Sequence, residues 1–218
     1  MRAAIVLGGG RSRRMGTDKL ALLLDGRPVL ERVVTAALGW ADAVVIAGDR
    51  PDGWRDDARV GFRREDPPFG GPVAGIAAAL EIWEGRIAGR VGRGQGGLPK
   101  PGAEEAPLGG VRPGEVMLLA GDLADPDAVV HLLAGAAPGV DGVVLEDDEG
   151  WPQYLAGRYR TEALAAAVRD LAQCRDVSVR RLLGGLDLAR VRAPQPALTD
   201  LDTPEVAKLW GAKAPHLR

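Results

Sequence analysis

The sequence predicts a single α/β domain with a mostly parallel central sheet and helices on both faces of that sheet. Two observations lead to this fold class. Short β-branched runs alternate along the chain with longer segments rich in alanine and leucine, the pattern of strands joined by crossover helices. The chain has 218 residues, of which 46% are hydrophobic and 27% charged, so it can bury one substantial core.

The expected elements follow one another in order. Apolar and β-branched runs predict strands at Ala3–Leu7, Ala43–Ala47, Val60–Arg63, Glu115–Ala120, Gly142–Leu145, Tyr154–Tyr159 and Asp187–Arg192. Alanine- and leucine-rich segments predict helices at Val29–Leu38, Pro72–Trp83, Pro126–Leu133, Thr161–Gln173, Val179–Leu183 and Pro204–Trp210. The last helix has a strong start signal, because Thr203 is a favourable N-cap and Pro204 suits the first helical position.

One segment interrupts this alternation. Residues 85–114 are rich in glycine and proline, although they join an expected helix to an expected strand, where connections usually have about 2–6 residues. We interpret the segment as a flexible insertion within a single domain of residues 1–218. Its arginines and lysine either fold over a phosphate ligand or belong to a plain surface loop.

Composition and charge exclude several classes of protein. A net charge of −2 and a pI near 5.8 give no globally basic surface for nucleic acid. No apolar stretch approaches the roughly 18 residues of a membrane span, and the apolar N-terminal run is too short for a signal peptide. The lone Cys174 cannot form an internal disulfide and is expected to pack within a helix. These features predict a cytoplasmic protein without nucleic-acid or membrane partners.

A glycine-rich loop, residues 7–19, directly follows the first expected strand. Gly8, Gly9 and Gly10 allow the backbone to turn sharply and to approach a ligand closely, and successive N–H groups in such a turn bind anions. Four cationic side chains belong to the same loop: Arg11, Arg13, Arg14 and Lys19. Glycines and cations together predict a site for a triphosphate.

Two common phosphate-binding motifs do not fit this loop. A P-loop ends in Gly-Lys-Ser/Thr, whereas Lys19 follows Asp18 and precedes Leu20. A dinucleotide fingerprint needs a third glycine where Arg13 stands, and an acid about 20 residues further on. Asp49 lies well beyond that spacing, so neither motif explains the loop.

The loop does resemble the signature of the molybdenum cofactor guanylyltransferase family and its nucleotidyltransferase relatives. The matching residues are Leu7, Gly9, Gly10, Ser12, Arg14, Met15, Gly16, Asp18 and Lys19. The resemblance implies a Rossmann-like, three-layer nucleotidyltransferase fold in which this loop wraps the triphosphate of a nucleotide. It places Leu7, Gly8, Gly9 and Gly10 against the nucleotide, with Lys19 and Arg14 on phosphate oxygens. The first two matching glycines resemble the guanine-using branch more than the cytosine-using branch.

Carboxylates at strand ends are the expected metal ligands, because Mg²⁺ prefers oxygen ligands and open parallel sheets bind ligands at the carboxyl ends of their strands. Asp122 follows the strand Glu115–Ala120 by one glycine, where the resembling family has its metal-binding aspartate. The proline that usually follows in the family is missing here. Asp125 and Asp127 are interpreted instead as acids at a helix start.

Two further segments resemble parts of the family's nucleotide site. Asp200 and Asp202 precede Thr203, and one of them either shares the metal with Asp122 or only supports the Thr203 cap. The loop after the third strand carries over Asp66 and Gly71 as nucleotide-binding residues, although a structural turn alone would also explain its glycines. Ala47 stands where the family often has a nucleotide-binding asparagine, so that base contact is absent.

For the acceptor, the resemblance indicates Gln153 near Trp151, and we add Arg180 as a candidate for its phosphate. Core packing for the aromatic side chains near Gln153 and a solvated helix face for Arg180 are the competing interpretations. The expected reaction transfers GMP from GTP to molybdopterin, the precursor form of the molybdenum cofactor, and releases pyrophosphate with Mg²⁺ as cofactor. Molybdoenzyme-specific maturation proteins are the further partners considered.

Three alternatives to this reaction stay open at the level of sequence. The first is a related enzyme that uses CTP. The second is transfer to a sugar phosphate or phospholactate. The third is a nucleotide-binding homologue without catalysis.

Overall fold

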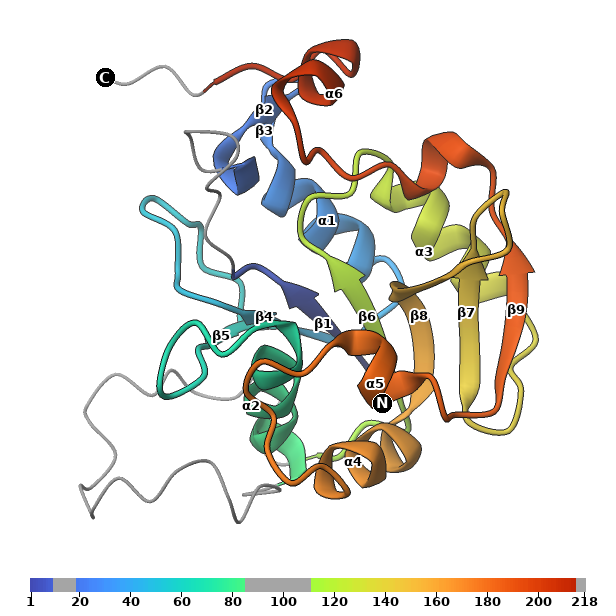
Figure 1. Ribbon diagram of the computed structural model, residues 1–218. Helices are drawn as coiled ribbons and strands as arrows, with labels where there is room; N and C mark the ends of the chain where they lie inside the picture. Colours follow the sequence, from blue (N-terminus) through green and yellow to red (C-terminus); the bar gives the residue numbers. More distant parts are fainter. Residues whose placement is uncertain (10–18, 85–110, 215–218) are drawn as a thin grey trace.

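A seven-stranded sheet forms the centre of the fold within residues 1–9, 19–84 and 111–214, the parts of the chain that the computed structural model describes (Figure 1). Its strands stand in the order β5-β4-β1-β6-β8-β7-β9. Their bounds are β1 Arg2–Leu7, β4 Ala43–Ala47, β5 Val60–Arg63, β6 Glu115–Ala120, β7 Gly142–Glu146, β8 Pro152–Arg160 and β9 Leu188–Arg192. Strand β8 is antiparallel to both of its neighbours, and every other pairing in this sheet is parallel. The sheet is therefore mostly parallel, as predicted.

Helices cover both faces of the sheet, which gives three layers (Figure 1). Ala4 and Val6 of β1 pack on one face with α1 (Val29–Leu38) and α3 (Pro126–Gly135). Ala3 and Ile5 point to the opposite face, as alternation along a strand requires. There they pack with three further helices: α2 (Pro72–Glu84), α4 (Thr161–Arg169) and α5 (Val179–Leu183).

A smaller apolar cluster lies beside the main sheet. The two-stranded hairpin β2 (Leu23–Leu24) and β3 (Arg27–Pro28) packs against α6 (Pro204–Leu209) through Leu24, Leu201 and Ala207. The hairpin turns at Asp25 and Gly26, which both have positive φ angles of 53° and 77°. This cluster attaches the C-terminal part of the described chain to the segment that follows Lys19.

The expected strands and helices are all present, with small differences in their bounds. The helix predicted over Thr161–Gln173 is wrong at its end, because α4 stops at Arg169. Cys174 therefore lies in the α4–α5 connection and not in a helix, although it is buried in the cluster around α2. A hydrogen bond attaches this connection to the β5–α2 connection, because the backbone N–H of Asp176 donates to the carbonyl of Gly70. Asp176 has a φ of 57°.

The predicted insertion lies largely outside the described residues, which end at residue 84 and resume at residue 111. Its last residue, Gly114, donates to the Met1 carbonyl and accepts from the Thr161 amide, so it belongs to the network around the start of β6. In the described part of the chain, no helix combines the length and apolar character needed to cross a membrane.

The N-terminus of α3 provides a test of local stability. The Asp125 side chain accepts a hydrogen bond from the Ala128 amide at 3.1 Å, whereas Asp127 lies in the first turn. We expect Asp125→Ala to lower the free energy of unfolding by about 1 kcal/mol, because it leaves a helix N–H unsatisfied. Asp127→Ala should cost only a few tenths of a kcal/mol, through the helix dipole. Urea unfolding measures both, and equal losses would contradict the capping role.

Candidate active site

A cleft opens beyond the carboxyl ends of β5, β4, β1 and β6, where open parallel sheets bind ligands. Its volume is about 1610 Å³. The ends of β1 and β6 supply Gly8, Gly9 and Asp122 to its floor. The side chains and backbone that line it elsewhere come from the β4–β5 and β5–α2 connections and from the segments around Lys19 and Asp202.

Close backbone packing at the strand ends explains Gly48 and Gly121, which directly follow β4 and β6. A Cβ on Gly48 would lie 2.8 Å from the carbonyl oxygen of Gly8, and one on Gly121 would lie 2.6 Å from that of Leu7. The Gly8 amide donates to the Ala47 carbonyl at 3.2 Å, and the Gly121 amide donates to the Leu7 carbonyl at 3.2 Å. The ends of β4, β1 and β6 therefore contact one another through backbone atoms beneath the cleft, with no side chains between them.

Lys19 connects two of the predicted metal-binding carboxylates. It begins the short 3-10 helix Lys19–Ala21, and its ammonium group donates to Asp122 and, at 2.6 Å, to Oδ1 of Asp202. Burial by itself lowers the pKa of Lys19. The hydrogen bonds and charges of Asp122 and Asp202 outweigh burial and raise that pKa. Lys19 is thus held as a cation between the end of β6 and the segment before α6.

The segment with Asp200 and Asp202 pairs with the residues after β6. Asp200 forms an antiparallel bridge with Leu123, and the Leu201 amide donates to the Asp122 carbonyl at 3.0 Å. Both Asp200 and Asp202 line the cleft, as their spacing by one residue predicts. Thr203 caps α6, because its own hydroxyl oxygen accepts a hydrogen bond from the Val206 amide.

Asp200 shows the electrostatic consequence of this crowding. Asp200 is exposed as a whole residue, but the surrounding protein partly removes its carboxyl from water. This desolvation, together with the charges of Asp122 and Asp202, raises the pKa of Asp200 to about 7 against the opposing charge of Lys19. The cleft therefore gathers more negative charge than Lys19 alone offsets, which favours binding of a further cation.

The raised pKa of Asp200 predicts a pH dependence of stability that can be measured. The folded protein holds a proton on Asp200 up to about pH 7, whereas the unfolded chain releases it near pH 3.8. The stabilising contribution of protonated Asp200 is therefore present below pH 3.8 and is lost as pH rises towards 7. In metal-free protein, Asp200→Asn should flatten this part of the stability profile, measured by urea unfolding between pH 4 and 7. Parallel profiles for the two proteins would contradict the raised pKa.

The donor set fits a magnesium ion held partly by its substrate. Among the described residues, no three histidine, cysteine or carboxylate side chains form a group that could hold a metal ion. Mg²⁺ usually takes only one or two protein carboxylates and completes its shell with phosphate oxygens and water. Asp122 and Asp202 provide such a pair, and at present they share the ammonium cation of Lys19. Asp200 lies beside them.

The other predicted residues are partly brought into the cleft. Leu7, Gly8, Gly9 and Gly71 line it. Asp66 is exposed and is not among the lining residues. Gly10 and Arg14 lie outside the described residues, so their predicted roles stay predictions.

Neither of the two acceptor candidates lines the main cleft. Gln153 lines a side pocket of about 220 Å³, which shares Ala120, Leu155 and Asp200 with the main cleft. The Gln153 amide donates to Asp147 at 2.8 Å. Arg180 lies over the ring of Trp151 at 5.9 Å.

Several cleft residues were missed in the sequence. Asp49 and Arg64 follow β4 and β5, Phe69 lies in the β5–α2 connection, and Arg175 reaches the cleft from the α4–α5 connection. The positions of Asp49 and Arg64 just after parallel strands were a usable signal, because such ends share one edge of the sheet. The sequence carried no such signal for Arg175. Its position depends on the contact between Asp176 and Gly70, which joins distant parts of the chain.

The family model for the MobA-like NTP transferase domain matches residues 4–191. The chain belongs to this family. It is 42% identical over 81 residues to a probable molybdenum cofactor guanylyltransferase from Methanothermobacter thermautotrophicus, a match that covers 34% of this chain and 41% of the relative. The matched region thus spans about two fifths of that curated relative.

Solved structures share the fold over almost the whole chain. A molybdopterin-guanine dinucleotide biosynthesis protein A from Archaeoglobus fulgidus superimposes with a TM-score of 0.53 at 19% identity, covering 96% of both chains. A homologue of Mycobacterium tuberculosis rv0371c from Mycobacterium sp. strain JC1 gives a TM-score of 0.59 at 19% identity, covering 96% of this chain and 95% of the other. These likenesses confirm the predicted three-layer α/β fold.

Proposed function

We propose that this protein is a magnesium-dependent nucleotidyltransferase that transfers GMP from GTP to molybdopterin and releases pyrophosphate. The observation that carries the proposal is the placement of Lys19 between Asp122 and Asp202, next to the bare backbone of Gly8 and Gly9. This arrangement places a cation, carboxylate oxygens suited to a metal, and glycine backbone that a ligand can approach closely at one end of a cleft. Family membership and the partial match to a guanylyltransferase support the choice of base and acceptor.

The chain's own residues would act by positioning and by charge. The ammonium of Lys19 is suited to phosphate oxygens once a nucleotide separates it from the carboxylates, and Asp122 and Asp202 would then hold Mg²⁺. When bound, Mg²⁺ neutralises charge that develops on the phosphates. An oxygen of the acceptor phosphate attacks the α-phosphorus of GTP, and the bond to pyrophosphate breaks. The acceptor phosphate is already ionised at neutral pH, so no protein nucleophile is needed.

The decisive experiment measures pyrophosphate release from each nucleoside triphosphate with Mg²⁺, with and without molybdopterin. We expect release only with GTP and molybdopterin together, and loss of release when EDTA replaces Mg²⁺. Release with CTP would indicate a cytidylyltransferase, and release with a sugar phosphate or phospholactate would reassign the acceptor. Nucleotide binding without any release would indicate a non-catalytic homologue. The proposal keeps the expectations of one domain over residues 1–218 and of a cytoplasmic location.

A further inference from the structure

Three side chains with no role so far form one connected group on the wall of the cleft. The guanidinium of Arg64 donates to Oδ2 of Asp49 at 2.5 Å and lies 4.9 Å from the centre of the Phe69 ring. All three residues line the cleft. Phe69 is 49% exposed and has a φ of 63°, a backbone conformation that costs a bulky residue free energy. Because the ring lines the cleft, its face is placed where it could stack on a planar ligand.

The position of this group relative to the phosphate end is set by the strand order. Gly8, Gly9 and Asp122 mark the ends of β1 and β6, whereas Asp49 follows β4 and Arg64 follows β5. Strand β5 lies two strands from β1, roughly 10 Å away at the usual spacing between strands. A nucleotide whose phosphates contact Lys19 and whose sugar crosses β4 would bring its base to this wall.

We propose that Asp49 is the residue that selects guanine, with Arg64 holding its carboxylate in place. The inference rests on the proposed use of GTP. Guanine presents two neighbouring donors, N1–H and the 2-amino group, which one carboxylate accepts together. The guanidinium of Arg64 is a matching donor for the adjacent O6, and the exposed ring of Phe69 offers a face for stacking. Adenine and cytosine present an acceptor beside their amino group, and a carboxylate repels it.

Two other carboxylates on this side of the cleft fit the role less well. Oε1 of Glu65 accepts a hydrogen bond from the Gly70 amide at 3.1 Å, so that side chain shapes the connection to α2. Asp52 lies in the turn at residues 52–53, further along the connection from the end of β4. Asp49 follows the end of β4 by one residue and is the one of the three that forms an ion pair with an arginine in the described part of the chain.

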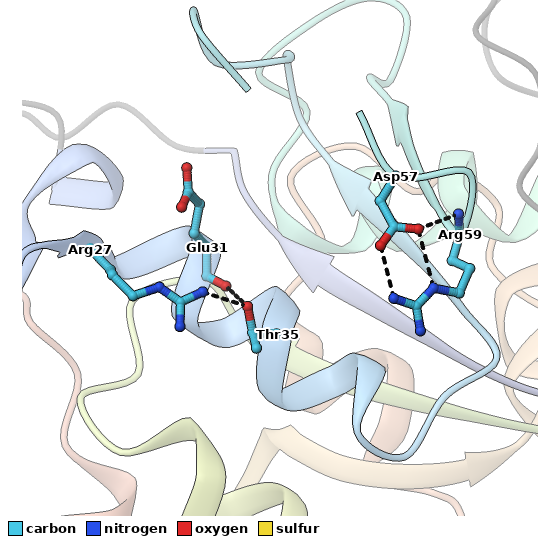
Figure 2. Close-up of polar contacts among 5 residues, drawn as sticks. All are labelled: Arg27, Glu31, Thr35, Asp57 and Arg59. Carbon is cyan, nitrogen blue, oxygen red and sulfur yellow. Dashed lines mark hydrogen bonds and ion pairs between the residues drawn. The ribbon is translucent and has the colours of Figure 1, made fainter. Parts of the chain in front are cut away.

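A plain surface ion pair is the competing explanation, and such pairs contribute little to stability. A matched pair exists elsewhere on the same connection. Arg59 donates to Asp57 at 2.8 and 3.1 Å. Figure 2 shows the two side chains in contact, and neither residue lines the cleft. Asp57→Asn therefore reproduces the chemical change of Asp49→Asn at an exposed ion pair outside the cleft.

The test uses the chain of residues 1–218 and varies both the base of the nucleotide and the side chain at position 49. The amide that Asp49→Asn introduces would offer a donor where the carboxylate accepted, which suits the 2-carbonyl of xanthine and not the 2-amino group of guanine. Calorimetry with Mg²⁺ and with GTP, XTP or ITP measures the preference of the wild type, Asp49→Asn, Asp49→Ala, Asp52→Asn and Asp57→Asn. We expect Asp49→Asn to shift the ratio of GTP to XTP affinity by about a hundredfold, the effect of one or two charge-assisted hydrogen bonds.

The variants and analogues separate base reading from folding. ITP lacks the 2-amino group, so the wild type should bind it about tenfold more weakly than GTP, and Asp49→Ala should bind the two almost equally. Asp57→Asn and Asp52→Asn should keep the wild-type preference. A gain in XTP affinity cannot arise from a misfolded variant, and thermal unfolding checks that each variant is folded.

The outcomes distinguish this inference from the proposed function. If the wild type prefers GTP and Asp49→Asn keeps that preference, Asp49 does not select the base, and the proposed transfer is unaffected. If the preference switches but no pyrophosphate is released with molybdopterin, the inference stands and the proposed transfer fails. A wild-type preference for CTP or ATP overturns the inference together with the guanine assignment.

Discussion

Replacing Asp122 by asparagine is expected to reduce kcat for nucleotidyl transfer about a thousandfold while the protein stays folded. Asp122 is buried at the end of β6, pairs with Lys19 and lies beside Asp202. The substitution keeps the size of the side chain but removes the charge that would hold Mg²⁺. Losing charge stabilisation at a reacting phosphate costs several kcal/mol, and about 4 kcal/mol corresponds to a thousandfold in rate.

The matched control is Asp127→Asn, which changes an exposed aspartate in the first turn of α3 and should leave kcat within about twofold. Single-turnover measurements across a range of Mg²⁺ concentrations add a second readout. If Asp122 holds the metal, the variant needs more Mg²⁺ for half-maximal rate, whereas a purely structural defect leaves that concentration unchanged. Near-normal turnover by Asp122→Asn would remove Asp122 from the proposed mechanism.

The order of strands and helices was predictable because each element carries its own local signal. Apolar β-branched runs such as Ala43–Ala47 are buried in the sheet, and the Thr203-Pro204 start signal does begin a helix. The β2–β3 hairpin was missed even though Asp25-Gly26 is a favourable pair for a tight turn with positive φ. Its strands have only two residues each, too short for an alternating pattern to show.

The site was predictable where its residues follow strands, and not where tertiary contacts place them. Asp122 was expected at the edge of the sheet. It lies close to Asp200 and Asp202 because Leu123 and Asp200 form a bridge. That pairing joins residues far apart in sequence, so their spacing alone does not reveal it, and only the family resemblance indicated that Asp200 or Asp202 could share a metal with Asp122.

The choice between Asp66 and Glu65 in the cleft also depends on tertiary structure. The turn of the β5–α2 connection leaves Asp66 exposed and places Glu65 in the lining. Asp49, Arg64 and Phe69 meet only because β4 and β5 are neighbours. Ala47 stands where the resembling family often has an asparagine, so the sequence predicts that one base contact is missing, but it does not indicate which residue takes over.

Adding one methyl group to the backbone at the end of β6 should destabilise the protein. Gly121→Ala is expected to lower the free energy of unfolding by about 1–3 kcal/mol, the usual cost of overpacking a close contact. The new Cβ would lie 2.6 Å from the carbonyl oxygen of Leu7, which is backbone and cannot rotate away, and 3.2 Å from Leu20. To relieve this contact, the end of β6 must move away from β1, which breaks the hydrogen bond from the Gly121 amide to Leu7.

The same movement should affect catalysis more than stability. Asp122 directly follows Gly121, so a shift of this backbone moves the carboxylate away from Gly8 and Gly9, and a misplacement of about 1 Å can cost about a hundredfold in rate. Gly135→Ala is the matched control, because a Cβ at this exposed end of α3 would meet nothing within 4 Å. It should leave both stability and kcat nearly unchanged. Urea unfolding and pyrophosphate release on the two variants test the argument, and equal behaviour would show that the ends of β1 and β6 can separate without moving Asp122.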